Sequence, residues 1–135
     1  MLYYVGVFKK GQLKMKEKQF ESKVKRYLES KGIYRLGTDV RGKNAVGYYT
    51  KRHGNVFTGS GLPDMQIVVR GLCCEIELKN ETGETSPMQD FIIDQINNSH
   101  GVALVVRPQH FDEFKNFMER KPTRKSIIIS VCLAF

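Results

Sequence analysis

Two neighbouring segments combine the pattern of a β-hairpin with charged residues at fixed positions. Residues 64–70 read Asp-Met-Gln-Ile-Val-Val-Arg, and residues 73–79 read Cys-Cys-Glu-Ile-Glu-Leu-Lys. Both are rich in strand-forming residues, and Arg70-Gly71-Leu72 is short enough to fold the second strand back on the first. Side chains alternate between the faces of a strand, so Glu77 and Lys79 are expected to project together, and the apolar residues beside them to face the core.

Such a hairpin places Asp64 beside Glu77 and Lys79. Phosphodiester hydrolysis needs an activated water, charge neutralisation at phosphorus and help for the leaving oxygen. Magnesium held by a few carboxylates can supply all three. We therefore assign Asp64 and Glu77 as metal ligands, with the backbone carbonyl of Leu78 as a third. We expect Lys79 to orient the attacking water or to stabilise charge developing on the phosphate.

Length and charge narrow the class of protein. The 135 residues fit a single domain spanning 1–135, and 22 basic against 14 acidic residues give a formal charge of +8. Such an excess favours polyanionic partners such as nucleic acid, although it is also compatible with a merely soluble basic surface. No stretch approaches the ~18 apolar residues that a membrane span requires. We expect a soluble protein without a membrane partner.

Cysteine usage favours a reducing compartment. The three cysteines are an odd number, and Cys73 and Cys74 are adjacent. Neighbours on a strand point to opposite faces, so this pair suits neither a disulfide framework nor a zinc site. The expected location is the cytoplasm of a bacterial or phage-infected cell.

Periodicity predicts the elements around the hairpin. A first helix has apolar residues at helical spacing and stops at Gly32, and a short strand follows at 33–36. The glycine-rich, basic stretch 37–61 is predicted to be a long loop or a loosely paired excursion. Ser86-Pro87 begins a second helix that ends at Gly101. The stripe of mostly apolar residues at helical spacing in that helix consists of Met88, Phe91, Ile92, Gln95 and Ile96.

The last elements complete an α/β fold. Residues 102–106 form a continuous apolar run, which is typical of a buried strand, and a final helix starts near Phe111 and ends near Arg120. The order is helix, three strands, helix, strand, helix. A helical crossover between strands 73–79 and 102–106 makes them parallel, so we expect a mixed central sheet flanked by helices.

These residues resemble the virus-type replication–repair nuclease family, called VRR-NUC, of the PD-(D/E)xK nuclease superfamily. The resemblance covers roughly residues 17–107. The matching segments are Gly61-Leu62-Pro63-Asp64, Glu75-Ile76-Glu77-Leu78-Lys79 and Ser86-Pro87-Met88-Gln89. It implies a restriction-endonuclease-like core in the order αβββαβ and cleavage of DNA that depends on Mg2+ or Mn2+. It also implies small homodimers that act on junctions, while larger family members cut flaps.

The resemblance adds site residues at which an ordinary structural role is also open. An acidic residue on the first helix is matched by Glu21, and a glutamine after the E-x-K strand is matched by Gln89. Glu21 is otherwise a solvated helix residue, and Gln89 a capping one. Glu75 lies on the same strand face as Glu77, where a surface charge or an ion pair is a better assignment than an outer metal ligand.

The segment between the first helix and the hairpin is a candidate nucleic-acid interface. It mixes basic side chains, which hydrogen-bond phosphates, with tyrosines, which stack on unpaired bases. A solvated loop is the alternative. The candidate contact residues are Arg41, Lys43, Tyr48, Lys51, Arg52 and His53.

The two ends, 1–16 and 121–135, lie outside the resemblance, and the core of the domain is expected to span about 17–120. Residues 1–8 are apolar enough for a strand, and Lys9 to Lys18 form a basic arm. Ile127 to Phe135 is apolar and suits an added edge strand or a subunit interface.

The sequence thus favours a metal-dependent endonuclease that acts on branched or structured DNA, as a homodimer with two sites on two strands. One alternative is a non-catalytic nucleic-acid-binding module with a nuclease-like fold. Another is a sequence-specific restriction-type enzyme.

Overall fold

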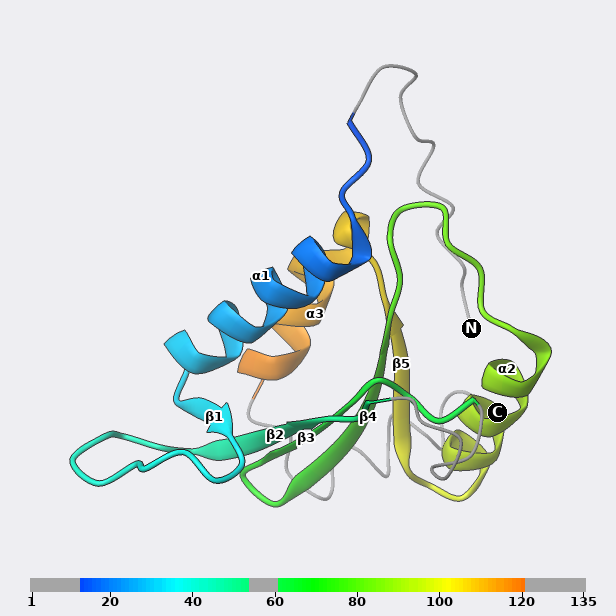
Figure 1. Cartoon of the computed structure of the whole chain (residues 1–135). Helices are drawn as coiled ribbons and strands as arrows, with labels where there is room; N and C mark the ends of the chain where they lie inside the picture. Colours follow the sequence, from blue (N-terminus) through cyan, green and yellow to red (C-terminus); the bar gives the residue numbers. More distant parts are fainter. Residues whose placement is uncertain (1–12, 54–60, 121–135) are drawn as a thin grey trace.

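A mixed sheet with helices on both sides forms the framework of the protein. The computed structural model describes residues 13–53 and 61–120. In Figure 1, α1 and α3 lie together over one side of the sheet, and α2 lies beyond β5 on the other side. In chain order the elements are α1 (Glu17–Ser30), β1 (Ile33–Arg35), β2 (Gly47–Lys51), β3 (Met65–Val69), β4 (Leu72–Leu78), α2 (Pro87–Asn98), β5 (Val102–Val106), the 3-10 turn η1 (Pro108–His110) and α3 (Phe111–Glu119).

The sheet has five strands in the order β1-β2-β3-β4-β5. The pairs β2–β3 and β3–β4 are antiparallel, and β1–β2 and β4–β5 are parallel. The predicted hairpin and the predicted parallel crossover are therefore confirmed. The hairpin turns at Arg70 and Gly71, whose φ angles of 49° and 81° are both in the left-handed region. Two such residues make the tight turn whose twist matches that of the flanking strands.

Strand β2 decides, for part of residues 37–61, between the two predictions of a long loop and a loosely paired excursion. Part of that segment is not a loop, because Gly47–Lys51 pairs with both β1 and β3. The Tyr-Tyr-Thr run has high strand propensity, and Tyr49 is buried in the core. The surrounding glycines and basic residues obscured this short signal. Four strands, rather than three, therefore precede α2. Residues 54–60 of the segment lie outside the described part of the chain.

The main core lies between the sheet and the pair α1–α3. Helix α1 contributes Phe20, Val24 and Leu28, and alternate residues of β3 and β4 meet them from the sheet. Phe20 and Phe111 make an edge-on ring contact with centroids 5.8 Å apart, which joins α1 to α3. The exposed Cys73 and the buried Cys74 show that alternate residues of β4 face opposite ways, as predicted.

Helix α2 begins as predicted but faces the sheet with a different side. Ser86 caps it and Pro87 is its first residue. Ile93 is its buried residue, whereas Met88 and Phe91 of the predicted stripe are 49% and 63% exposed. Gln89, four residues before Ile93, also faces the sheet, because its Nε2 donates to Glu77 of β4. Its side chain and backbone N–H form a capping box with Ser86.

The remaining predictions fall partly outside the described residues. The strand suggested at 1–8, the first four residues of the basic arm and the apolar segment 127–135 all lie there. Within residues 13–53 and 61–120, no helix is long and apolar enough to cross a membrane.

Gly47 offers a test of the β2–β3 pairing. A Cβ at this position would lie 2.2 Å from the carbonyl oxygen of Val68 and 2.9 Å from the Cα of Val69. Since these are backbone atoms of the partner strand, Gly47→Ala must force the strands apart. We expect it to lower the free energy of unfolding by about 3 kcal/mol in a urea titration.

Gly42→Ala is the matched control. Gly42 has a φ of 75°, but a Cβ added there would meet no atom within 4 Å, so only the backbone penalty applies. That penalty is about 1 kcal/mol. Equal losses in the two variants would contradict the close approach of β2 and β3.

Candidate active site

Glu77 is the buried charged residue on which the candidate site centres. Its position on β4 turns it away from the main core toward α2, and it is only 2% exposed. Its Oε1 accepts a hydrogen bond of 2.6 Å from Gln89 Nε2 and lies 3.3 Å from Lys79 Nζ. Burial and the negative charge of Asp64 raise the pKa of Glu77, and Lys79 opposes that rise.

The second oxygen of Glu77 is buried with no hydrogen-bond partner in the described part of the chain. Buried carboxylate oxygens are normally paired, because water that would solvate them is excluded. This oxygen is therefore free to bind a cation.

Asp64 lies at the start of β3, beside the end of β4. Its Oδ2 accepts a 2.9 Å hydrogen bond from the backbone N–H of Leu78, the residue after Glu77. Its Oδ1 lies 3.2 Å from Lys51 Nζ. The backbone carbonyl of Asp64 also accepts from the N–H of Arg52 at 2.7 Å, which fixes it to the end of β2. The hairpin thus brings Asp64, Glu77 and Lys79 together, as the sequence pattern indicates.

Lys51 links this group to helix α1. Its ammonium lies 3.2 Å from Glu21 Oε2 and 3.2 Å from Asp64 Oδ1. Burial alone would lower the pKa of Lys51, but the charges of Asp64 and Glu21 outweigh it and raise the pKa. The sequence predicted Lys51 to contact nucleic acid. Recognition of β2 as a strand would have indicated that Lys51 lies beside Asp64, since Lys51 pairs in the sheet with Met65, the residue after Asp64.

Glu21 is not a freely solvated helix residue. It binds Lys25 Nζ at 2.6 Å as well as Lys51. Burial would raise its pKa, but Lys25 and Lys51 together lower it below the usual range. Glu21 therefore stays ionised at the edge of the site.

Gln89 serves both as a capping residue and as a partner of Glu77. Its Oε1 accepts from the N–H of Ser86 at 2.9 Å, and its own N–H donates to Ser86 Oγ at 3.2 Å. Its Nε2 remains to donate to Glu77. The N-terminus of α2 thereby fixes the direction of the Glu77 carboxylate.

Glu75 forms an ion pair, in agreement with the sequence-based preference. It binds Arg52 through both carboxylate oxygens and accepts a 3.0 Å bond from Gln66 Nε2. Arg52 also donates to the carbonyl of Pro63 at 3.1 Å. Arg52, for which nucleic-acid contact stays a prediction, thus holds the chain before Asp64 against β4.

The other predicted contact residues lie apart from the carboxylates. Arg41 and Lys43 belong to the loop between β1 and β2, which projects at the cyan end of the sheet in Figure 1. Arg41 pairs with Asp39 at 2.6 Å, and Lys43 lies over the Tyr34 ring at 4.8 Å. Tyr48 is half-buried on β2, and His53 is exposed at the end of the described segment.

The donor set suits a hard cation held by few protein ligands. Asp64 and Glu77 offer carboxylate oxygens, one of them unpaired and buried, and oxygen donors are what Mg2+ and Mn2+ prefer. Across residues 13–53 and 61–120, no group of three or more His, Cys, Asp or Glu side chains is placed to share a metal. The backbone carbonyl of Leu78, whose N–H bonds Asp64, stays the predicted third ligand.

Comparisons with known proteins give no family for this chain. No protein-family model, no curated protein and no solved structure matches it.

Proposed function

We propose that this chain is a divalent-metal-dependent endonuclease that hydrolyses phosphodiester bonds in branched or structured DNA. The observation that carries the proposal is the buried Glu77 carboxylate, with one oxygen unpaired, next to Asp64 and Lys79. Buried ionisable groups with perturbed pKa values and incomplete pairing cluster at functional sites. The formal charge of +8 supports a polyanionic substrate.

The fold order supports the same proposal. Taken as α1, β2, β3, β4, α2 and β5, the elements follow the αβββαβ order of PD-(D/E)xK nucleases, and β1 is then an added edge strand. In this assignment Asp64 lies immediately before β3, the second of the three strands. Glu77 lies near the end of β4, the third strand, and Lys79 follows that strand directly. The proposed nuclease thus corresponds to the VRR-NUC resemblance in residue types, their order and their strands.

Each residue has a role that follows from its contacts. Asp64, Glu77 and the Leu78 carbonyl would hold Mg2+ or Mn2+, which supplies Lewis-acid activation of water and phosphate when bound. Lys79 has its ammonium 3.3 Å from Glu77, where it can hydrogen-bond a water or a phosphate oxygen. Gln89 keeps Glu77 oriented, and Glu21 with Lys51 holds Asp64.

Incubation of the purified protein with linear duplex, flap and four-way junction, with and without Mg2+, tests the substrate class. Mg2+-dependent cutting of the branched forms is the expected result. Preferred cutting of linear duplex at one sequence would indicate a restriction-type enzyme. Binding without cutting in any metal would indicate the non-catalytic module. The homodimer stays a prediction, and sedimentation of the full chain checks it.

Lys79→Ala separates binding from chemistry. The variant is expected to keep DNA affinity and to lose Mg2+-dependent cutting by about 100-fold or more, because it removes a charge at the reacting phosphate. Lys115→Ala is the matched control, since Lys115 pairs with Asp112 on α3 at 2.9 Å. Cutting by Lys79→Ala at the rate of the control would exclude Lys79 from the mechanism.

The raised pKa of Glu77 predicts how cation binding depends on pH. In the metal-free protein, the pKa of Glu77 is higher in the folded state than in the unfolded state. The protonated carboxyl therefore adds to stability below the unfolded-state pKa, and this contribution is lost as the pH rises through the folded-state pKa. Cation binding requires the deprotonated carboxylate of Glu77, so the stabilisation of the protein by Mg2+ increases as the pH rises. The rise in Tm caused by Mg2+ should be larger at about pH 8 than at about pH 5.

Glu77→Gln is expected to abolish both the Mg2+-induced rise in Tm and its pH dependence. Glu81→Gln provides a control that removes one carboxylate from the loop after β4, where Glu81 accepts hydrogen bonds from the N–H of Met15. A rise in Tm that survives in Glu77→Gln would place the cation elsewhere.

Lys51→Met tests the internal counter-ion. Without its ammonium, Glu21 and Asp64 lose a shared cation and repel each other, so the metal-free protein should have a lower Tm. Mg2+ should then raise the Tm by more than in the unaltered protein, because no resident charge competes with it. An equal or smaller rise would show that Lys51 does not oppose the cation.

A further inference from the structure

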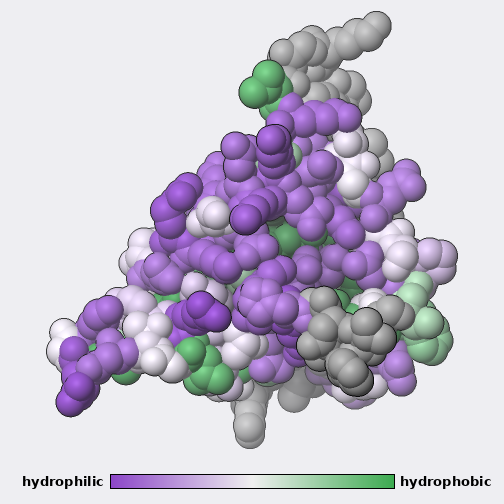
Figure 2. All heavy atoms as spheres, in the orientation of Figure 1, coloured by the Kyte–Doolittle hydropathy of each residue, from purple (hydrophilic) through white to green (hydrophobic). Residues whose placement is uncertain are grey.

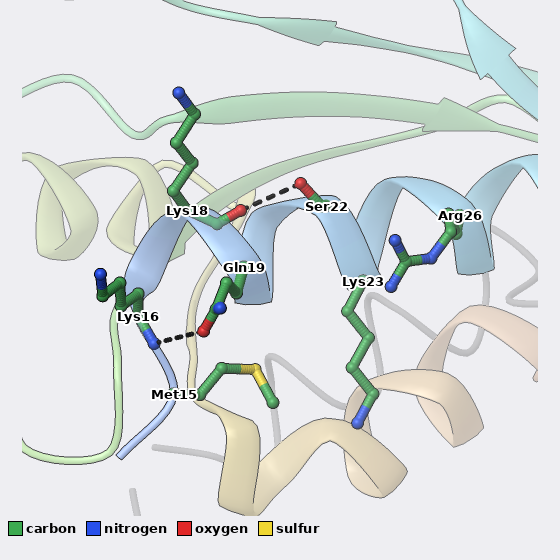
Figure 3. Close-up of a pocket in the computed structure, with 7 residues that line it drawn as sticks. All are labelled: Met15, Lys16, Lys18, Gln19, Ser22, Lys23 and Arg26. Carbon is green, nitrogen blue, oxygen red and sulfur yellow. Dashed lines mark hydrogen bonds between the residues drawn. The ribbon is translucent and has the colours of Figure 1, made fainter. Parts of the chain in front are cut away.

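A hollow on the outer side of α1 collects positive charge away from the carboxylates. It has a volume of about 560 Å³ and is lined by Met15, Lys16, Lys18, Gln19, Ser22, Lys23 and Arg26. Figure 3 shows these side chains spread along the first turns of α1 and the residues before it. Four of these seven residues are basic and none is acidic.

The cations of this hollow are largely uncommitted. Among residues 13–53 and 61–120, no salt bridge involves Lys16, Lys18 or Arg26, whereas Lys25 and Lys51 are paired with carboxylates. Lys23 lies over the Phe111 ring at 4.9 Å, a contact with an uncharged partner. In Figure 2 the same side of the molecule is covered mostly by hydrophilic residues.

The spacing of these residues suits a repeating anion. Lys18, Ser22 and Arg26 follow each other at four-residue intervals, so they form a row along one side of the helix with steps of about 6 Å. In Figure 3, Lys18 and Lys23 point to opposite sides of α1, which widens the charged surface. A polymer with regularly spaced phosphates can touch several of these groups at once, whereas a single small anion cannot.

The hollow is also connected to the candidate active site. Lys18 lies one helical turn before Glu21, and Lys25 one turn after it, on adjoining sides of α1. Glu21 in turn contacts Lys51, which contacts Asp64. A backbone lying across α1 therefore leads from the hollow toward the carboxylates past Lys18 and Lys25, which flank Glu21.

We propose that Lys16, Lys18, Lys23 and Arg26 form an anchoring site on α1 for the phosphate backbone of the DNA substrate, separate from the point of cutting. This proposal rests on the proposed function for the identity of the polyanion. It is a contact surface additional to the loop between β1 and β2, where Arg41 is paired with Asp39.

The test is DNA binding by Lys18→Gln/Arg26→Gln, measured by fluorescence anisotropy in chelator so that no cutting occurs. Each phosphate contact contributes about 0.9 to the slope of log affinity against log salt, so the slope should fall by about 2. Arg35→Gln/Arg120→Gln is the matched control, since both residues are exposed and lie outside the hollow. The control should show a clearly smaller change in slope, although its net charge falls equally.

A second variant adds a charge instead of removing contacts. Ser22→Glu places a carboxylate between Lys18 and Arg26 and should weaken binding, with an unchanged far-ultraviolet circular dichroism spectrum showing that the fold persists. Equal slopes for the α1 variant and its control, or unchanged affinity in Ser22→Glu, would overturn the proposal. So would tighter binding of phosphatidylserine vesicles than of DNA, because a membrane surface would then be the ligand.

Kinetics distinguish this site from the catalytic one. With a branched DNA that the protein cuts, Lys18→Gln/Arg26→Gln should raise KM and leave kcat unchanged, because the contact is equal in ground and transition states. A fall in kcat with unchanged KM would overturn the anchoring role. If no DNA is cut by any form of the protein, the endonuclease proposal fails, while the anisotropy result still decides whether α1 binds DNA.

Discussion

The burial of one incompletely paired carboxylate constrains the architecture around it. A buried charge is costly unless other groups compensate for it, and the penalty amounts to several kcal/mol per ion in real proteins. Oε1 of Glu77 accepts a hydrogen bond from Gln89 and lies beside the Lys79 ammonium. Oε2 has no hydrogen-bond partner among the described residues. The compensation of the Glu77 charge therefore depends on two elements, the end of β4 and the N-terminus of α2, being held at a fixed separation.

The surrounding secondary structure supplies that separation. The parallel pair β4–β5 is joined by α2, so the start of α2 must return to the level where β4 ends. The capping box fixes the Gln89 backbone and leaves its Nε2 pointing at Glu77. On the other side, Asp64 accepts from Leu78 N–H and is fixed by Arg52 and Lys51. The main core, packed on the opposite face of the sheet, holds these strands rigid.

The part of this arrangement that was predictable came from local patterns. Alternation along residues 73–79 placed Glu77 beside Lys79, and a short turn at Gly71 placed Asp64 near both, because each is a consequence of strand geometry. The contacts of Lys51 and Arg52 were not predictable in this way. They depend on β2 pairing with β3, and a five-residue strand among glycines and basic residues gives a weak signal. The apolar pattern of α2 was also misleading, because Ile93 is the buried residue of this helix, whereas Met88 and Phe91 are exposed.

The distribution of cations follows from the same electrostatic constraint. Lys51 and Arg52 near the carboxylates are held in ion pairs, so they add little net positive charge to attract a polyanion from a distance. A polyanion approaching an acidic site is repelled by it, so attraction must come from charges placed far enough away to remain unpaired. Helix α1 meets both conditions, because its sides face in different directions. The side bearing Glu21 faces the site, and the side bearing Arg26 faces solvent. A single helix can thus carry an acidic contact for the site and a basic surface for the substrate without one neutralising the other.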